Sequence, residues 1–257
     1  MDDELLERVA GWMRQARNVV ALTGAGISTE SGIPDFRGPD GVWTRDPKAE
    51  AKADIRVYVS DPTVRRAAWQ TRLDHPARGA QPNAGHRALA ELERQGRLAT
   101  LITQNIDGLH LAAGSSPART IEIHGTIREY ACLDCGARGP MADALERVRA
   151  GDPDPACLDC GGILKSATIS FGQSLVAADL ERAERASAES DLFLAIGTSL
   201  TVYPVAWLPE RALTSGARLV IINAEPTPLD GRAHAVLRGR IGEVLPALLE
   251  RAAAQPA

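Results

Sequence analysis

The stretch over residues 19–43 constrains the fold of this chain most strongly. It opens with an apolar run from Val19 to Leu22, typical of a buried strand, and then breaks into Gly24-Ala25-Gly26. Two glycines one residue apart allow a sharp turn and a close approach of the backbone to a ligand. A helical turn that starts near Ser28 would direct free N–H groups at an anion. This order of features predicts the pyrophosphate cradle that follows the first strand of a dinucleotide-binding sheet.

The glycine pattern departs from the usual dinucleotide fingerprint. That fingerprint has a third glycine three residues after the second, and Thr29 occupies this position. A plain nicotinamide dehydrogenase is therefore disfavoured, and a Gly-Ala-Gly turn alone is a weak signal. The loop that follows is more informative, because Asp35, Phe36 and Arg37 place an acid, an aromatic ring and a guanidinium together.

Composition limits the class of protein. The chain has 257 residues, of which 44% are apolar, so we expect one large domain, with or without a small insert, and a sizeable core. The net charge of −4 argues against bulk attraction to nucleic acid or to an anionic membrane. The chain has neither a leader-like apolar run at its start nor a stretch of about 18 apolar residues. We expect a soluble, cytoplasmic protein with no membrane partner and no direct nucleic-acid partner.

Strand-like and helix-like segments alternate along the chain. The expected strands are Val19–Leu22, Leu98–Thr103, Arg119–His124, Ala167–Phe171, Asp191–Ile196 and Arg218–Asn223. The expected helices are Glu4–Arg17, Pro62–Leu73, Gln81–Gln95, Val176–Ser187, Tyr203–Thr214 and Gly242–Ala253. This alternation predicts an α/β fold with a doubly wound, Rossmann-like parallel sheet. We expect residues 1–40, 81–125 and 166–257 to form that domain, residues 41–80 a helical cap, and residues 126–165 an inserted zinc-binding module.

The four cysteines form two Cys-x-x-Cys pairs, Cys132/Cys135 and Cys157/Cys160. Four thiolates in two such pairs suit a tetrahedral zinc ion, and a closed shell of four protein ligands leaves no position for a reacting water. We therefore expect one structural zinc ion. Free thiols or redox pairs are the alternative.

Polar residues and glycines follow several of the expected strands directly. Thr23, Gln104, His124, Gly197 and Asn223 each lie at or just past the carboxyl end of such a strand. Because ligands of open α/β sheets bind at these ends, we expect the five residues to share one site. His124 is the candidate general base, since an imidazole with an ordinary pKa near 6.5 suits that task.

A second polar cluster follows the strand that ends at Thr103. Asn105 and Asp107 could hold ribose hydroxyls or an amide, although an Asx turn that caps a helix is the preferred explanation for these two residues taken alone.

In combination, these motifs resemble those of the sirtuin family of NAD-dependent protein deacylases. The resemblance runs from about Val19 to Leu249. It rests on Gly24-Ala25-Gly26-Ile27-Ser28, Gly32-Ile33-Pro34-Asp35-Phe36-Arg37-Gly38, Gln104-Asn105-Ile106-Asp107, His124-Gly125, the two cysteine pairs, Gly197-Thr198-Ser199 and Asn223.

The resemblance implies a role for each matching residue. The implied NAD-binding residues are Gly24, Ala25, Gly26, Ser28, Glu30, Asp35, Phe36, Arg37, Gln104, Asn105, Asp107, Gly197, Thr198, Ser199, Asn223, Glu225 and Ile241. His124 is implied as the general base, with Asn105 also placed in the catalytic group. Ser170-Phe171-Gly172 and the stretch around Val202 resemble the two edges between which an acyl-lysine peptide pairs as an added strand.

The implied activity is deacylation of protein lysine, most simply deacetylation, with release of nicotinamide, O-acyl-ADP-ribose and free lysine. A mono-ADP-ribosyltransferase or NAD glycohydrolase on the same scaffold, or a non-catalytic NAD-binding module, are the alternatives. Acyl preference stays open. The stretch from Trp69 to Arg72 could align with the Tyr-x-x-Arg pair of desuccinylating sirtuins, so that Arg72 would pair an acyl carboxylate, but a solvated helix face is the alternative.

Overall fold

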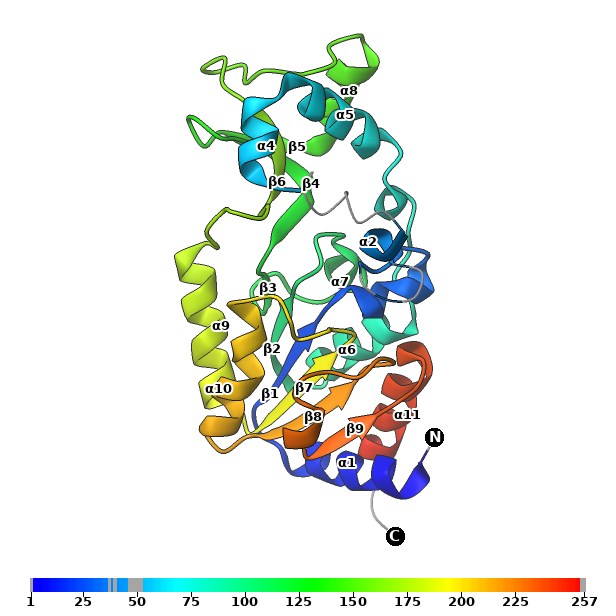
Figure 1. Ribbon diagram of the computed structural model, residues 1–257. Helices are drawn as coiled ribbons and strands as arrows, with labels where there is room; N and C mark the ends of the chain where they lie inside the picture. The colour runs from blue at the N-terminus through cyan, green and yellow to red at the C-terminus, as the bar shows by residue number, and fades with distance from the viewer. Residues whose placement is uncertain (1, 37, 39–40, 46–52, 255–257) are drawn as a thin grey trace.

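The structure is a computed structural model that describes residues 2–36, 38, 41–45 and 53–254. Arg37, one of the expected NAD-binding residues, lies outside the described residues. Figure 1 shows two parts: a larger one built around a twisted sheet with helices on both faces, and a smaller one that carries α4, α5, α8 and strands β4 to β6.

The large sheet has six strands in the order β3-β2-β1-β7-β8-β9, and every neighbouring pair is parallel. The strands are β1 (Val19–Thr23), β2 (Leu98–Thr103), β3 (Thr120–Glu122), β7 (Leu192–Ile196), β8 (Arg218–Ile222) and β9 (Ala235–Leu237). The expected doubly wound parallel sheet is therefore confirmed. Strand β9 was not among the expected strands.

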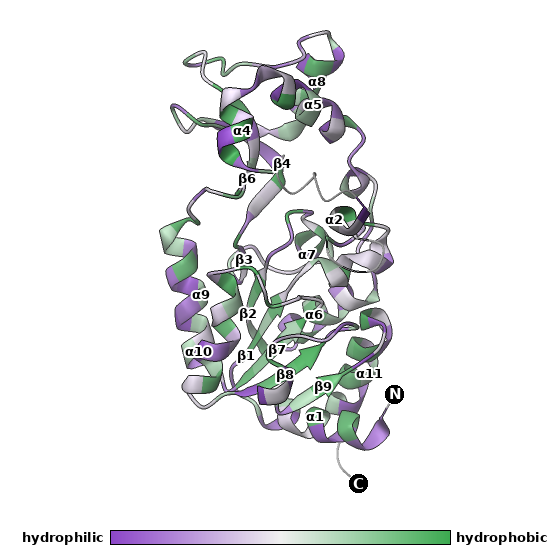
Figure 2. Ribbon diagram, in the orientation of Figure 1, coloured by the Kyte–Doolittle hydropathy of each residue, from purple (hydrophilic) through white to green (hydrophobic). Residues whose placement is uncertain are grey.

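Both faces of this sheet are covered, which explains why all five residues of β1 are buried. Val19 and Ala21 pack with one group of helices, whereas Val20 and Leu22 pack with the other. Figure 2 shows the central strands as the most hydrophobic part of the molecule. The helices on the first face are α1 (Asp3–Gln15), α6 (Ala84–Arg94) and α11 (Ile241–Ala253), and those on the second are α9 (Ala177–Glu189) and α10 (Leu208–Thr214).

The small sheet is antiparallel, in the order β5-β4-β6. Its strands are β4 (Gly125–Cys132), β5 (Arg138–Pro140) and β6 (Leu164–Thr168). The expectation of a main-sheet strand at Ala167–Phe171 is wrong, because β6 ends at Thr168 and pairs with β4. A short run of small and β-branched residues indicates a strand but not which sheet it joins. The division into domains by residue number stays a prediction.

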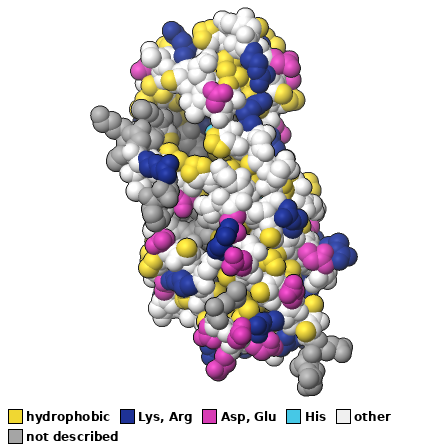
Figure 3. All heavy atoms as spheres, turned by 90° about the vertical axis from the view of Figure 1, so that its right-hand side faces the viewer, with side chains coloured by type: hydrophobic (Ala, Val, Ile, Leu, Met, Phe, Trp, Pro, Cys, Tyr) yellow, Lys and Arg dark blue, Asp and Glu magenta, His cyan; other side chains and the backbone are white. Residues whose placement is uncertain are grey.

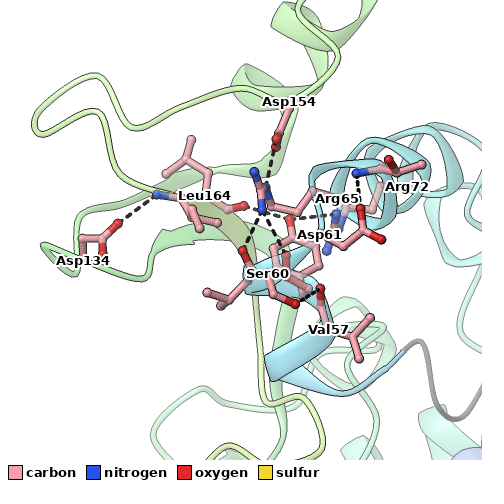
Figure 4. A network of polar contacts seen from close by, with 12 residues as sticks. Val57, Ser60, Asp61, Arg65, Arg72, Asp134, Asp154 and Leu164 are labelled. Carbon is pink, nitrogen blue, oxygen red and sulfur yellow. Dashed lines mark hydrogen bonds and ion pairs between the residues drawn. The ribbon is translucent and has the colours of Figure 1, made fainter.

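The small sheet packs against a helix of its own and against two helices of the cap. These are α8 (Met141–Arg149), α4 (Ile55–Ser60) and α5 (Pro62–Leu73). Trp69 of α5 is fully buried in a cluster that includes Cys132, Cys157 and Leu164. Figure 4 shows Arg65 of α5 directed at Asp154, with which it forms an ion pair of 2.9 Å. The hydroxyl of Tyr58 in α4 donates to the Leu164 carbonyl at 2.8 Å, so apolar and polar contacts together fasten the cap to the module.

The connections contain short helical segments. These are η1 (Ala25–Ser31), α2 (Val42–Arg45), η2 (Pro76–Arg78), α7 (Leu109–Ala112), η3 (Val205–Trp207) and η4 (Asp230–Arg232).

None of the described helices is both long and apolar enough to cross a lipid bilayer. On the face shown in Figure 3, basic side chains lie among acidic ones, so neither sign of charge dominates its described part.

Candidate active site

The turns after β1 and β7 touch each other through their glycines. The N–H of Gly26 donates to the carbonyl of Gly197 at 2.9 Å. A Cβ on Gly24 would lie 2.7 Å from that same carbonyl oxygen, and a Cβ on Gly26 would lie 2.8 Å from the Gly197 Cα. Gly197 itself has a φ of +60°, which disfavours any side chain. The glycines thus permit two loops to pack together. This role differs from the close approach of a ligand that the sequence suggested for them.

Ser28 is the centre of a hydrogen-bond network that joins the loops after β1 and β2. Its hydroxyl donates to Oδ2 of Asp107 at 2.7 Å. Nδ2 of Asn105 donates to the same hydroxyl and to the Gly24 carbonyl, each at 3.1 Å. The other oxygen of Asp107 accepts the Leu109 N–H at 2.9 Å, which is the Asx turn considered above. Asp107 therefore both caps a turn and faces the site.

Gln104 connects the loop after β2 to the loop after β7. Its side-chain amide donates to the Thr198 hydroxyl at 2.8 Å, and its backbone N–H donates to the Thr23 carbonyl at 2.9 Å. Three of the strand ends that were expected to converge are therefore joined by hydrogen bonds.

His124 directly precedes β4, and its Nδ1 is 3.1 Å from the Gln104 carbonyl oxygen. A carbonyl can only accept, so Nδ1 carries the proton and Nε2 keeps its lone pair in the neutral ring. Burial lowers the pKa of His124 below its usual 6.5, and the hydrogen bond to Gln104 opposes that shift. The ring is therefore neutral at pH 7 and can accept a proton through Nε2.

Two further histidines, His86 and His110, lie beneath the network and were not singled out from the sequence. Nε2 of His110 is 2.9 Å from the Thr23 hydroxyl, Nε2 of His86 is 3.4 Å from the Ser28 hydroxyl, and the ring centroids are 4.8 Å apart. Burial lowers the pKa of His86 to about 4, although nearby Asp107 raises it. Burial also lowers the pKa of His110 strongly. One sequence signal existed, because an Asn N-cap at Asn83 followed three residues later by an acceptor is typical of a capping box.

The loop after β8 is held by its own polar groups. Nδ2 of Asn223 donates to the Glu225 carbonyl at 2.7 Å, and the guanidinium of Arg238 donates to the carbonyls of both residues. Ile241, the first residue of α11, is buried. Glu30 is directed at α11, where its Oε1 accepts the Gly242 N–H at 2.8 Å.

The loop after η1 carries the remaining expected cofactor residues. Oδ1 of Asp35 accepts the Gly38 N–H at 2.9 Å, and its carbonyl accepts the Val42 N–H at 2.8 Å. Phe36 exposes 43% of its surface, which is high for an aromatic side chain. Two further expected cofactor residues lie elsewhere. Ala25 is the first residue of η1. Ser199 lies in the loop after β7, where its hydroxyl is 2.8 Å from that of Thr201.

One of the expected peptide edges already has a partner within the chain. Phe171 donates its N–H to the Ala53 carbonyl at 3.1 Å and accepts the Ile55 N–H at 2.9 Å. The backbone of Phe171 is thus paired with the cap, and the Ser170 N–H donates to the side chain of Gln173 at 2.9 Å. Gly172 follows with a φ of +81°. Val202 of the opposite edge is half-buried.

Arg72 does not lie on a solvated helix face, so that alternative is wrong. Its guanidinium is 4.7 Å from the ring centroid of Trp69 and 5.4 Å from that of Tyr58. It also donates to the Ser166 hydroxyl at 3.3 Å. Next to it, Lys165 is buried, and this burial, with a smaller effect from Arg72, lowers the pKa of Lys165 to about 7.

The four cysteines converge at the end of β4 that is remote from His124. Their sulfur atoms all lie within 4.8 Å of one another, with 3.5 Å between Cys132 and Cys160 and 3.7 Å between Cys135 and Cys157. Four zinc–sulfur bonds of about 2.3 Å in a tetrahedron place the sulfurs about 3.8 Å apart. All four cysteines are free of disulfide bonds. The cluster therefore fits one structural zinc ion.

Known proteins share both the sequence and the fold. A sequence model described as the Sir2 family matches residues 24–204. The chain is 53% identical over 231 residues to the NAD-dependent protein deacetylase 2 of Streptomyces coelicolor. The aligned residues cover 90% of this chain and 96% of that protein. It is 45% identical over 249 residues to the NAD-dependent protein deacetylase 1 of Pyrobaculum aerophilum, covering 96% and 94% of the two chains.

Solved structures agree. A Sir2 complex with a p53 peptide and NAD+ superimposes with a TM-score of 0.85 at 35% identity, covering 95% of this chain and 97% of that one. A Sir2 protein bound to a propionylated peptide gives a TM-score of 0.85 at 34% identity, with the same coverage. The match of the family model to most of the chain and the identity to relatives of nearly equal length together show that this chain belongs to the Sir2 family, the sirtuins.

Proposed function

We propose that this protein is an NAD-dependent protein-lysine deacylase that acts chiefly as a deacetylase and yields nicotinamide, O-acyl-ADP-ribose and free lysine. The names of its relatives and the peptide and NAD+ complexes of its structural neighbours support this activity. The observation that carries it is the imidazole of His124, neutral at pH 7 and with a free Nε2, at the strand edge where the Ser28 network lies.

The residues around Ser28 fit a bound dinucleotide by the chemistry of their donors and acceptors. When bound, NAD supplies the ribose carbon from which nicotinamide leaves. Asn105 and Asp107 offer an amide and a carboxylate to ribose hydroxyls and to the carboxamide, and Gln104 holds the loop that carries them. The exposed ring of Phe36 is suited to fold over the reacting carbon and exclude water.

His124 acts as the general base in this proposal. Nε2 accepts a proton from a ribose hydroxyl, while Nδ1 keeps its hydrogen bond to the Gln104 carbonyl and thereby fixes the orientation of the ring. The zinc ion has no part in the chemistry, because four thiolates complete its coordination.

Arg72 is the residue through which the acyl preference can be tested. Its contacts with Ser166, Trp69 and Tyr58 favour a structural role, and the buried Lys165 beside it, whose pKa is lowered to about 7, adds a second positive charge only when it is protonated. A carboxylate on the acyl chain would be attracted to Arg72 and to the protonated form of Lys165. Acetyl-lysine is nevertheless the proposed substrate, on the strength of the relatives.

A panel of acetyl-, propionyl-, succinyl- and long-chain acyl-lysine peptides tests the proposal, with nicotinamide release and mass spectrometry as the readouts. We expect O-acetyl-ADP-ribose in proportion to deacetylated peptide and its loss in His124→Ala. ADP-ribose attached to protein, or free without an acyl peptide, would indicate a transferase or a glycohydrolase instead. NAD binding with no turnover would indicate a non-catalytic module.

A cytoplasmic location also belongs to the proposal. It is supported by the four free thiols of the cysteine cluster, since reducing compartments favour metal-bound cysteines over disulfides.

A further inference from the structure

Glu30 lies at the end of the glycine-rich turn, but its carboxylate reaches a helix that starts far along the chain. Oε1 accepts the N–H of Gly242, 212 residues away, at 2.8 Å. Oε2 lies 3.3 Å from the guanidinium of Arg240, and the Glu30 side chain is only 20% exposed. Both carboxylate oxygens are therefore engaged by the N-terminus of α11.

Helix α11 has no local side-chain cap. Its N-cap residue is Arg240, which makes no capping hydrogen bond. The first N–H groups of a helix have no partners within it, and a negative charge placed there is stabilised by the helix dipole. Glu30 therefore does for α11 what an aspartate or serine N-cap does for other helices.

The residues around this contact are shaped to let it form. A Cβ on Gly242 would lie 2.8 Å from Oε2 of Glu30, so a side chain at this position would push the carboxylate away from the helix N-terminus. The neighbouring Ile241 packs with equal closeness. Its Cδ1 is 2.9 Å from where a Cβ on Gly197 would be, and its Cγ2 is 3.0 Å from the corresponding position on Gly85. The N-terminus of α11 thus lies against η1, the loop after β7 and the start of α6.

We propose that Glu30 is a positioning residue for the cofactor. It fastens the N-terminus of α11 to the glycine-rich turn and so holds Ile241 against the loop after β7. This role rests on the proposed function, because it takes the residues around the two glycine turns to form an NAD site. It differs from the direct contact with NAD that the family resemblance implied for Glu30.

Calorimetry with NAD and steady-state kinetics test this role. A charge-assisted hydrogen bond of this kind corresponds to about tenfold in affinity, so Glu30→Ala should weaken NAD binding about tenfold while kcat at saturating NAD is unchanged. Glu30→Gln keeps an acceptor for the Gly242 N–H and should recover most of the affinity. Glu243→Gln is the matched control, because Glu243 is 62% exposed and its oxygen lies 3.8 Å from the same Arg240. It should bind NAD as the unmodified protein does.

A double-mutant cycle separates positioning from direct contact. Gly242→Ala should weaken NAD binding when Glu30 is present, because the new methyl meets its carboxylate. It should have no further effect in the Glu30→Ala background. Additive effects of the two substitutions, or a harmless Gly242→Ala, would overturn the proposal.

Hydrogen exchange at the Gly242 amide gives a readout that does not require turnover. Faster exchange in Glu30→Ala, but not in Glu243→Gln, supports the contact between Glu30 and the N-terminus of α11. This result would hold even for a protein with no deacylase activity. Unchanged exchange in Glu30→Ala rules this contact out, whether or not the protein is a deacylase.

Discussion

The hydroxyl of Ser28 donates a 2.7 Å hydrogen bond to the carboxylate of Asp107, and this contact joins the loop after β1 to the loop after β2. Asn105 donates to the same hydroxyl, so removing it affects two polar side chains at once. We expect Ser28→Ala to lower kcat/KM for NAD at least about tenfold, since lost partners of buried polar groups cost about 1–3 kcal/mol each. Nicotinamide release over a range of NAD concentrations measures the effect.

Thr29→Ala is the control for this substitution. Thr29 is exposed, and its hydroxyl donates only to the Gly26 carbonyl of its own turn, at 3.0 Å. Its kinetics should match those of the unmodified protein. If Ser28→Ala behaved in the same way, the network would have no part in binding NAD.

The pH dependence of activity follows from the environment of His124. Burial lowers its pKa below 6.5, so the neutral base persists at pH 7 and activity is lost only as the pH falls through that lowered pKa. We expect kcat/KM for the acyl peptide to be flat between pH 7 and 8, with its acid inflection below 6.5. An inflection above 6.5 would contradict the assignment of His124 as the base.

Regular elements could be read from the sequence where an apolar run has clear polar or glycine boundaries. The expected bounds of β2 and α5 match the structure, because Gly96 precedes the strand and Asp61-Pro62 opens the helix. Strand β9 could not be predicted, because three residues are too few to show a period. The sheet that β6 joins could not be predicted either, because the hydrogen-bond partners of a strand leave no local mark in a sequence.

The candidate site could be predicted in part for a related reason. Parallel strands bring their carboxyl ends to one edge, and this rule alone placed Gln104 near Thr23 and Gly197. The contacts of Glu30 with α11 and of Arg72 with Ser166 join segments that are distant in the sequence, so no local sequence pattern predicts them. The capping-box spacing after Asn83 indicates His86, but the burial of this histidine could not be predicted, because a buried histidine and a solvated one look alike in a sequence.

The stability of the protein should fall in mild acid because of His86, which is fully buried. Its folded pKa of about 4 is below the ordinary 6.5, so the unfolded chain binds the proton first as the pH drops. The contribution of His86 is constant above pH 6.5 and costs about 3 kcal/mol by pH 4, with His110 acting in the same direction. Denaturant unfolding between pH 7.5 and 4.5 measures this slope.

His86→Gln is the informative variant for that slope. Glutamine can accept the Asn83 N–H that Nδ1 of His86 now accepts at 3.3 Å, which preserves the capping box but removes the titrating group. The loss of stability in acid should become smaller. If the free energy of unfolding of His86→Gln depended on pH as that of the unmodified protein does, another group would cause the loss of stability in acid.

Removing zinc should destabilise the small module and reduce activity without touching the chemistry. Cys132 and Cys157 are buried beside Trp69 and Leu145, so losing the metal leaves thiols in an apolar cluster that the ion had held together. We expect chelation, or Cys135→Ser, to lower the melting temperature and the deacylation rate together. Protein verified to be free of zinc that kept both values would show that the cluster has no structural role.

The buried Lys165 makes the stability depend on pH at the alkaline end as well. It is 3% exposed, and burial lowers its pKa from 10.5 to about 7, so the folded state binds fewer protons than the unfolded state between these values. Stability from this group therefore rises with pH across that window, and at pH 7 the folded protein bears most of the penalty. Lys165→Met removes the charge but also the 2.6 Å hydrogen bond to the Thr168 carbonyl. We expect this variant to gain stability over the unmodified protein at pH 7, by a few kcal/mol more than at pH 10, in paired denaturant titrations. An equal difference at the two pH values would mean that Lys165 keeps an ordinary pKa in the folded protein.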